Sequence, residues 1–146
     1  MTSGGKALVR FVADDLFVGV TPAGRALVLD TNSQRSSAPS PVELLLVALG
    51  TCTATDVAGI LKKKRQHVTS YTVEVSGERR EDYPRKYTSM HVHHIITGAG
   101  ISEKAVAQAV ELSETKYCSV AATLRPQVEI HTTFEIIEAG RPTPGE

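Results

Sequence analysis

Short apolar runs rich in β-branched residues predict three β-strands near the start of the chain. These strands cover residues 7–12, 16–20 and 26–30. Asp14-Asp15 separates the first two and Pro22-Ala23-Gly24 the next two, and both sequences are typical of tight turns. Because short turns join neighbouring antiparallel strands, we expect a three-stranded meander. A polar loop at residues 31–39 follows it.

A long helix is predicted after this loop. Ser40 is a suitable N-cap, Pro41 suits the first helical position, and Glu43 lies at the third, as in a capping box. The segment ends in four basic residues, 62–65, which favour the negative end of the helix dipole. We therefore expect a helix from Pro41 to about Arg65.

The apolar residues of this helix nearly circle its axis between Leu44 and Leu61. A helix of this length could cross a membrane, but threonines and Asp56 interrupt it, and a carboxylate is costly in lipid. We interpret it as a buried helix of a soluble core and expect no membrane association. One meander covers only one side of such a helix. We therefore predict that a second copy of the chain covers the other side, in an isologous and obligate homodimer.

The rest of the chain returns to strands and then alternates with helices. Strands are expected at residues 70–78, 88–97 and 128–137, and helices at residues 102–112 and 118–124. The predicted order is βββ-α-ββ-αα-β with the strands in antiparallel groups, which is typical of the α+β class. We predict a single domain over residues 1–146, with its core at 6–138 and a tail at 139–146.

Composition narrows the classes of function. The 146 residues include 16 Lys or Arg and 16 Asp or Glu, so the formal net charge is zero, and tryptophan is absent. Neither a basic footprint nor an aromatic stacking surface is evident, and we expect no nucleic-acid partner. The N-terminus lacks the apolar segment of a signal peptide. This predicts a cytoplasmic protein, in which thiols stay reduced unless they are catalytic or sensing.

Cys52 and Cys118 are the only two cysteines in the sequence. A single free cysteine is more often a buried, inert residue than a reactive one. Each of these cysteines, however, lies where two helices are expected to meet, and paired thiols can carry out peroxide or disulfide chemistry without a cofactor. We therefore treat Cys52 and Cys118 as a candidate redox pair and expect no bound cofactor.

Two acidic residues share the helix of Cys52. The thiol lies about ten residues from the helix start, too far for the dipole to acidify it. Asp56 follows one turn later and would raise the thiol pKa, while a role as partner of a buried hydroxyl or an arginine fits equally well. Glu43 lies roughly 13 Å before Cys52 along the axis and about half a turn out of phase, so it can serve a thiol only from a second subunit. The alternative role of Glu43 is the capping box.

Histidines form the other candidate cluster. His91 and His93 share one face of a predicted strand, and His94 points to the other face. Two strand ligands are too few for a structural zinc site, so a metal would have to recruit Cys52 and Cys118 as well. Exposed strand histidines are the simpler interpretation, and we predict no metal site.

Several motifs resemble a known family. Those that resemble the OsmC/Ohr family are Ser40-Pro41-x-Glu43-Leu44-Leu45, Gly50-x-Cys52 and Tyr117-Cys118-Ser119-Val120. Those that resemble its YhfA-like branch are Asp56-Val57-x-x-Ile60-Leu61-Lys62, Glu78-Arg79-Arg80-Glu81 and Ala109-Val110-Glu111-Leu112-Ser113. The resemblance covers roughly residues 6–138, and it is specific because both cysteine motifs stand at the family's separation.

This resemblance implies an OsmC-like fold, in which two chains form an intertwined homodimer and two sheets wrap two central, cysteine-bearing helices. The better-known members are thiol-dependent organic hydroperoxide reductases. The resemblance therefore implies that Cys52 is the peroxidatic thiol, that Cys118 is the resolving thiol, and that an external dithiol is the reductant. The resemblance also implies a catalytic glutamate at the start of this helix, and the candidate for it in this chain is Glu43.

Two departures from the reductases motivate a second hypothesis. Their glutamate directly follows the proline, whereas Val42 holds that place here and Glu43 comes one residue later. Their N-terminal turn also carries an arginine, whereas the nearest arginines in this chain are Arg10, Arg25 and Arg35. The alternative is a non-catalytic protein on the same scaffold that binds a small hydrophobic ligand or senses redox state.

Overall fold

The computed structural model describes residues 4–139, which form six strands and four helical segments. In chain order they are β1 (Leu8–Ala13), β2 (Leu16–Val20), β3 (Ala26–Asp30), α1 (Pro41–Lys63), β4 (His67–Arg79), β5 (Tyr87–Ala99), α2 (Glu103–Leu112), η1 (Ser113–Tyr117), α3 (Ser119–Leu124) and β6 (Glu129–Glu138). The order confirms the predicted α+β class, with one unpredicted element, the π-helical turn η1. The predicted tail at 139–146 lies outside the described residues beyond Ala139.

The chain forms two compact units that divide within α1, between Leu45 and Leu46. The first unit holds the sheet β1-β2-β3, whose two pairings are both antiparallel, as predicted. Strand β1 is exposed along its whole length, and its exposed large side chains are Leu8, Val9, Phe11 and Val12. The prediction that residues 1–146 act as one domain stays a prediction.

A buried carboxylate, Asp30 at the end of β3, organises the loop that leads into α1. Its Oδ2 atom accepts hydrogen bonds from Arg35 Nε at 2.8 Å and from Ser37 Oγ at 2.6 Å, and its Oδ1 atom accepts from Arg35 Nη2 at 2.9 Å. The Arg35 guanidinium, followed by the Ser37 hydroxyl, holds the pKa of Asp30 far below its usual range. The loop therefore has a fixed shape built around one negative charge.

Helix α1 begins at the predicted capping box. The Glu43 N–H donates to Ser40 Oγ at 3.3 Å, and the Ser40 N–H donates to Glu43 Oε2 at 3.4 Å. The helix ends at Lys63, two residues before the predicted end, because Arg65 takes a positive φ of 56° that turns the chain toward β4. Among residues 4–139, α1 is the one helix long and apolar enough to cross a membrane, a property that core helices of soluble proteins share.

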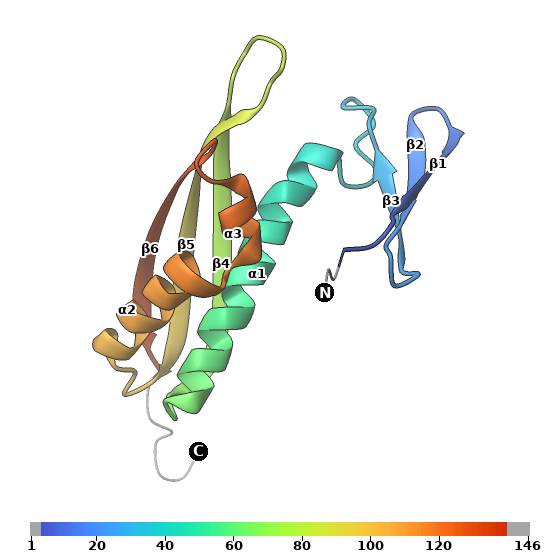
Figure 1. Ribbon diagram of the computed structural model, residues 1–146. Coiled ribbons are helices and arrows are strands. Elements are labelled where there is room, and N and C mark those ends of the chain that lie inside the picture. The colour runs from blue at the N-terminus through green and yellow to red at the C-terminus, as the bar shows by residue number, and fades with distance from the viewer. Residues whose placement is uncertain (1–3, 140–146) are drawn as a thin grey trace. The chain divides into compact units, whose positions relative to one another are not determined.

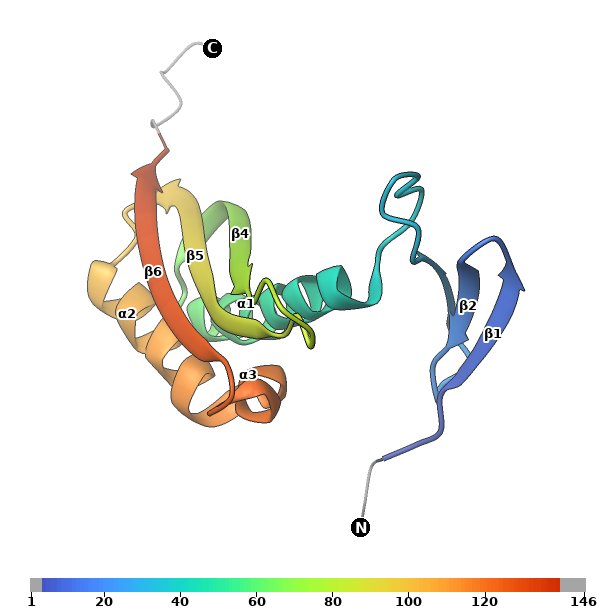
Figure 2. The same cartoon turned by 90° about the horizontal axis from the view of Figure 1, so that it is seen from above.

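The second unit contains the sheet β4-β5-β6 with three helices on one side of it (Figures 1 and 2). Strands β4 and β5 form a long antiparallel pair, as predicted. Strand β6, however, runs parallel to β5, so the expectation of antiparallel groups is wrong for this pair. The reason is the connection: α2, η1 and α3 carry the chain back along the sheet before β6 begins, which is the crossover that parallel neighbours require.

The core of this unit lies between the helices and β5. Alternate residues of β5 point inward, and Val92, His94 and Ile96 are almost fully buried. The cluster around Ile96 comprises Val57, Leu61, Ala105, Val106, Ala109 and Val110. These residues come from α1, α2 and β5, so the packing that buries α2 also fixes the same face of α1 against the sheet. That arrangement determines which side chains of α1 meet the segment around Cys118.

Candidate functional site

The two thiols meet between α1 and the start of α3. Cys52 lies in the middle of α1 and is half-buried, whereas Cys118 is the N-cap residue of α3 and is 4% exposed. Both cysteines are free. The Cys52 side chain is close enough to affect the ionisation of Cys118 through a hydrogen bond and through charge. The structure therefore brings together two residues that are far apart in the sequence.

Cys118 has a raised pKa. Burial raises its pKa, the Ala121 N–H at 3.4 Å from Sγ lowers it, and the hydrogen bond and charge of Cys52 raise it, with a raised pKa as the result. A thiol with a raised pKa stays protonated and can donate its proton to a neighbouring thiolate. Cys118 is therefore the thiol of the pair suited to act as a proton donor.

A chain of hydroxyls lies next to the thiol pair. Ser113, fully buried at the start of η1, donates from Oγ to Asp56 Oδ2 at 2.8 Å, and its Oγ lies 2.8 Å from Thr53 Oγ1. Of the two roles considered for Asp56, the structure shows that of partner to a buried hydroxyl. Sequence reasoning missed Ser113, although it falls on the buried stripe of α2 at the spacing of Val106 and Val110, where a polar residue signals a partner.

A small cavity lies beside Asp56, one turn after Cys52 on α1. Its volume is about 210 Å³, and the residues that line it are Thr55, Asp56, Gly59, Ile60, Lys63 and Tyr117. Tyr117 directly precedes Cys118, so the cavity has one wall from each of the two segments that carry the thiols. It offers room for a small molecule near the pair.

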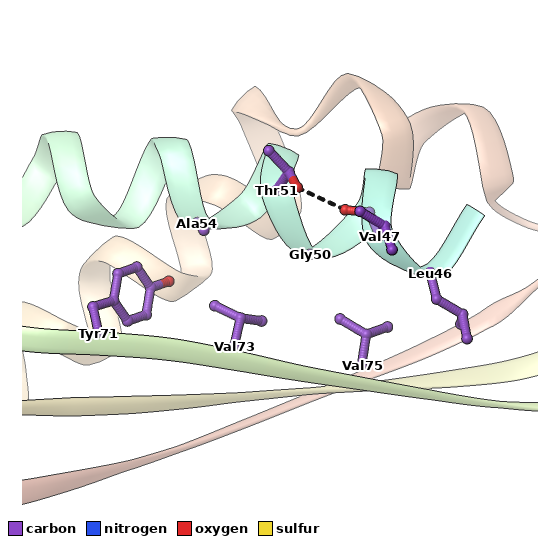
Figure 3. Close-up of a pocket in the computed structure, with 8 residues that line it drawn as sticks. All are labelled: Leu46, Val47, Gly50, Thr51, Ala54, Tyr71, Val73 and Val75. Atoms are coloured by element: carbon purple, nitrogen blue, oxygen red, sulfur yellow. Dashed lines mark hydrogen bonds between the residues drawn. The ribbon is translucent and has the colours of Figure 1, made fainter. Parts of the chain in front are cut away.

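A larger, mostly apolar groove of about 330 Å³ lies between α1 and β4 (Figure 3). Tyr71, Val73 and Val75 rise from β4 toward Gly50 and Ala54 of α1. The Thr51 hydroxyl donates to the Val47 carbonyl at 2.8 Å, so this polar group is satisfied within its own helix. Cys52 is absent from the lining, because it lies on a different face of α1. The groove is therefore an apolar surface separate from the thiol pair.

Comparison with known proteins places the chain in a family. A family model described as "OsmC-like protein" matches residues 33–133, a stretch that includes both cysteines and most of the second unit. The chain belongs to the OsmC-like family. It is also 42% identical over 134 residues to Protein YhfA of Escherichia coli K12, across 92% of this chain and 99% of that protein. The resemblance to the YhfA-like branch is thereby confirmed.

Solved structures give the same OsmC-like fold. A hypothetical protein from Aquifex aeolicus VF5 is 31% identical, with a TM-score of 0.84 over 95% of this chain and 100% of that chain. An organic hydroperoxide resistance protein OsmC from Legionella pneumophila is 12% identical, with a TM-score of 0.68 over 92% of this chain and 98% of that chain. The second similarity shows a shared fold only. The OsmC-like fold prediction is confirmed.

Glu43 of this OsmC-like chain is an exposed residue in the first turn of α1, and its carboxylate closes the capping box with Ser40. The capping role considered from the sequence is therefore present. Glu43 belongs to the first unit, whereas both thiols belong to the second. A catalytic role for Glu43 stays a prediction.

Two arginines of the chain are bound to acidic residues. Arg35, one of the three candidates, is engaged with Asp30 through two of its guanidinium nitrogens. Arg125, which the sequence did not single out, binds Glu114 Oε1 at 2.6 Å and the Glu114 carbonyl at 3.0 Å, and so holds the outer side of η1. The Arg35 guanidinium fixes the loop before α1, and the Arg125 guanidinium fixes η1. Neither group is assigned as the donor that activates Cys52.

The histidines separate as the strand pattern predicted. His91 and His93 lie on the outer face of β5, where both rings lie 2.7 Å from the Thr133 hydroxyl, whereas His94 is fully buried on the inner face. Within residues 4–139, no group of three or more His, Cys, Asp or Glu is arranged to hold a metal ion. The thiol pair and the strand histidines are therefore separate features of the second unit.

Proposed function

We propose that this protein is a cysteine-based peroxidase that reduces organic hydroperoxides through Cys52 and Cys118. Family membership supports a redox or peroxide-resistance role, since the OsmC-like relatives include a protein named for organic hydroperoxide resistance. The observation that carries the proposal is the contact between the two thiols, in which a protonated Cys118 faces Cys52. The small cavity beside Asp56, with Ile60 and Tyr117 in its lining, favours an organic hydroperoxide over hydrogen peroxide.

The reaction proceeds in three balanced steps. The Cys52 thiolate attacks the terminal oxygen of the hydroperoxide, the O–O bond breaks, and the alkoxide takes a proton and leaves as an alcohol, with Cys52 now a sulfenic acid. The Cys118 sulfur then attacks the Cys52 sulfur, and the hydroxyl leaves with the Cys118 proton as water. An external dithiol reduces the resulting disulfide by exchange and is itself oxidised. The cycle needs no cofactor and suits a reducing compartment such as the cytoplasm.

Peroxide consumption tests this proposal. Cumene hydroperoxide and hydrogen peroxide are supplied separately to the wild type and to Cys52→Ser, with dithiothreitol as the reductant. We expect rapid loss of cumene hydroperoxide with the wild type, slower loss of hydrogen peroxide, and only background loss with the variant. Equal rates for the two proteins would refute a peroxidase that depends on Cys52.

The active form in this proposal is an intertwined homodimer. Exposed apolar side chains on β1, among them Val9 and Phe11 at 65% and 67% exposure, are unusual on a monomer. Only 28% of the most apolar 18-residue stretch of α1 is buried within one chain. A second copy would cover these surfaces. Sedimentation at low micromolar concentration tests this, because a well-folded monomer there would contradict the dimer.

Glu43 has a catalytic role across this dimer in the same proposal. Glu43→Gln preserves the capping box, since glutamine serves at that position, but it removes the carboxylate charge. We expect Glu43→Gln to keep the thermal stability of the wild type and to lose most of its peroxidase activity. Retained activity in Glu43→Gln would assign Glu43 to helix capping alone.

A second candidate function is non-catalytic binding of a small hydrophobic ligand or redox sensing on this scaffold. The groove between α1 and β4 favours it, because its lining is mostly apolar and its hydroxyl from Thr51 is satisfied internally. Tight binding of a fluorescent fatty acid together with slow peroxide turnover would favour this function. Fast, Cys52-dependent turnover would exclude it as the main role.

A further inference from the structure

Ser113 links the two segments that carry the thiols. It is fully buried, and its hydroxyl donates to Asp56 Oδ2 at 2.8 Å. A hydroxyl has one proton, so the contact of 2.8 Å with Thr53 Oγ1 requires the Thr53 hydroxyl to donate to Ser113. Thr53 directly follows Cys52, and Asp56 lies one turn beyond it on α1. The side chain of Ser113 is therefore fixed to the part of α1 that carries the peroxidatic thiol.

The backbone of the same residue holds Cys118. The Cys118 N–H donates to the Ser113 carbonyl at 2.8 Å, which closes the π-helical turn η1. One residue thus binds α1 through its side chain and the resolving cysteine through its carbonyl. The path from Cys52 to Cys118 through Thr53 and Ser113 contains two hydrogen bonds.

The π-helical turn η1 determines which backbone N–H donates to the Ser113 carbonyl. In a continued α-helix the Ser113 carbonyl would accept from the N–H of Tyr117, whereas the wider turn passes that bond to Cys118. As a result Tyr117 is 49% exposed and Cys118 is 4% exposed. The additional residue in the turn therefore places the thiol, rather than the tyrosine, in the buried position after Ser113.

We infer that Ser113 is a positioning residue that holds Cys118 against Cys52 for disulfide closure, an inference that rests on the proposed peroxidase. In this closure the S–S bond forms between the two cysteines, and the sulfenic hydroxyl of Cys52 leaves as water with the Cys118 proton. Ser113 touches neither the peroxide nor the reacting sulfurs in this role. It acts through its hydrogen bonds to Thr53, to Asp56 and to the backbone N–H of Cys118.

The test separates formation of the sulfenic acid from closure of the disulfide. Ser113→Ala, the wild type and Thr115→Ala are mixed with one equivalent of cumene hydroperoxide, and samples are quenched over time with dimedone, which labels sulfenic acid, for mass spectrometry. Thr115 is the matched control, because its hydroxyl lies in the same turn but donates only to the Glu111 carbonyl at 2.8 Å. Ser113→Ala removes the hydrogen bond to the Asp56 carboxylate and the acceptor of the Thr53 hydroxyl, which predicts disulfide closure slowed at least about tenfold.

Sulfenic acid formation should stay near the wild-type rate in Ser113→Ala, so the dimedone adduct at Cys52 accumulates. Thr115→Ala should match the wild type in both steps. Disulfide closure at the wild-type rate in Ser113→Ala, or an equal slowing in Thr115→Ala, would overturn the inference.

If Ser113→Ala fails to fold, the comparison of Asp56→Asn with Asp56→Ala replaces it, because asparagine still accepts from Ser113 and alanine does not. Closure slowed in Asp56→Ala alone supports the role, and equal closure in both overturns it.

A glutathione titration keeps this test independent of the peroxidase proposal. Oxidised glutathione takes two electrons from the two thiols to give the Cys52–Cys118 disulfide and two reduced glutathione molecules, with no peroxide involved. We expect the equilibrium constant for this disulfide to fall about tenfold in Ser113→Ala and to be unchanged in Thr115→Ala. If the wild type consumes no hydroperoxide but this difference appears, the proposed function fails and the positioning role stands. Equal constants in all three proteins would remove the positioning role.

Discussion

The hydroxyl of Tyr71 and Nδ1 of the fully buried His94 share a hydrogen bond, with 2.6 Å between Oη and Nδ1. The two rings also stack, with centroids 5.9 Å apart and 18° between their planes. Burial, followed by the charge of Asp56, raises the pKa of Tyr71, while burial, followed by His93, lowers the pKa of His94 to about 4. Both groups are therefore neutral near pH 7, and Nε2 of His94 lacks a hydrogen-bond partner among the described residues.

The neutral His94 predicts a loss of stability in weak acid. The unfolded chain binds a proton at His94 near pH 6.5, whereas the folded protein binds it only near pH 4, so protons favour the unfolded state between these values. His94 should contribute about 3 kcal/mol less to the free energy of unfolding at pH 4 than above pH 6.5. Urea denaturation measured at several pH values between 4 and 7 checks this.

His94→Gln is the matched control for that measurement. Glutamine can still accept from Tyr71, but it does not titrate, so the variant should lack this part of the acid slope. Carboxylates such as Asp30 contribute to acid unfolding in both proteins and cancel in the comparison. Parallel stability curves for the two proteins would contradict a buried, neutral His94.

Truncation of Leu61 should strongly destabilise the second unit. Leu61 is 1% exposed and packs with Val57, Ile96 and Val106 between α1, α2 and the sheet. Leu61→Ala leaves a cavity there, so we expect the free energy of unfolding to fall by about 2–5 kcal/mol. Lys104→Ala on the exposed side of α2 should change it by less than about 0.5 kcal/mol. Denaturation at one fixed protein concentration makes the comparison, and similar values for both variants would place Leu61 outside the core.

Removal of the Asp30 charge should loosen the loop before α1. Asp30→Asn weakens the contacts to Arg35 and Ser37 that fix this loop, so trypsin should cut after Arg35 several times faster than in the wild type. Asp14→Asn is the control, because Arg35 donates to the backbone carbonyl of Asp14, which the substitution keeps. Unchanged cleavage in Asp30→Asn would show that the loop holds its shape without this charge.

Cys118→Ser should stop the reaction cycle after one turn. With no resolving thiol, the sulfenic acid at Cys52 should persist, and mass spectrometry should find the protein one oxygen atom heavier after one equivalent of hydroperoxide. Continued turnover with a dithiol should be much slower than in the wild type. Cys52→Ser treated in the same way should gain no oxygen. Full-rate turnover in Cys118→Ser would remove the resolving role from Cys118.

Local features of the sequence were sufficient to predict most of the helices and strands. Strand alternation located β4, β5 and β6 to within three residues, and the Ser40–Glu43 pattern marked the start of α1. These predictions succeed because capping and side-chain periodicity depend on residues only a few positions apart. The end of α1 was missed by two residues, because the positive φ of Arg65 reflects the route to β4 rather than any residue preference.

The sequence by itself determined which faces of the helices and strands are apolar and where most of these elements lie. It also determined that two thiols and one capped helix form a family pattern. Only the tertiary structure decided that β6 runs parallel to β5, that the Ser113 hydroxyl binds Asp56 across 57 positions, and that Cys118 faces Cys52. The physical reason is that a periodic pattern tells which side of an element is buried but not which distant side chain it meets. These distant partners follow from how α1, α2 and the sheet pack together. The π-helical turn η1 then places Cys118 opposite Cys52.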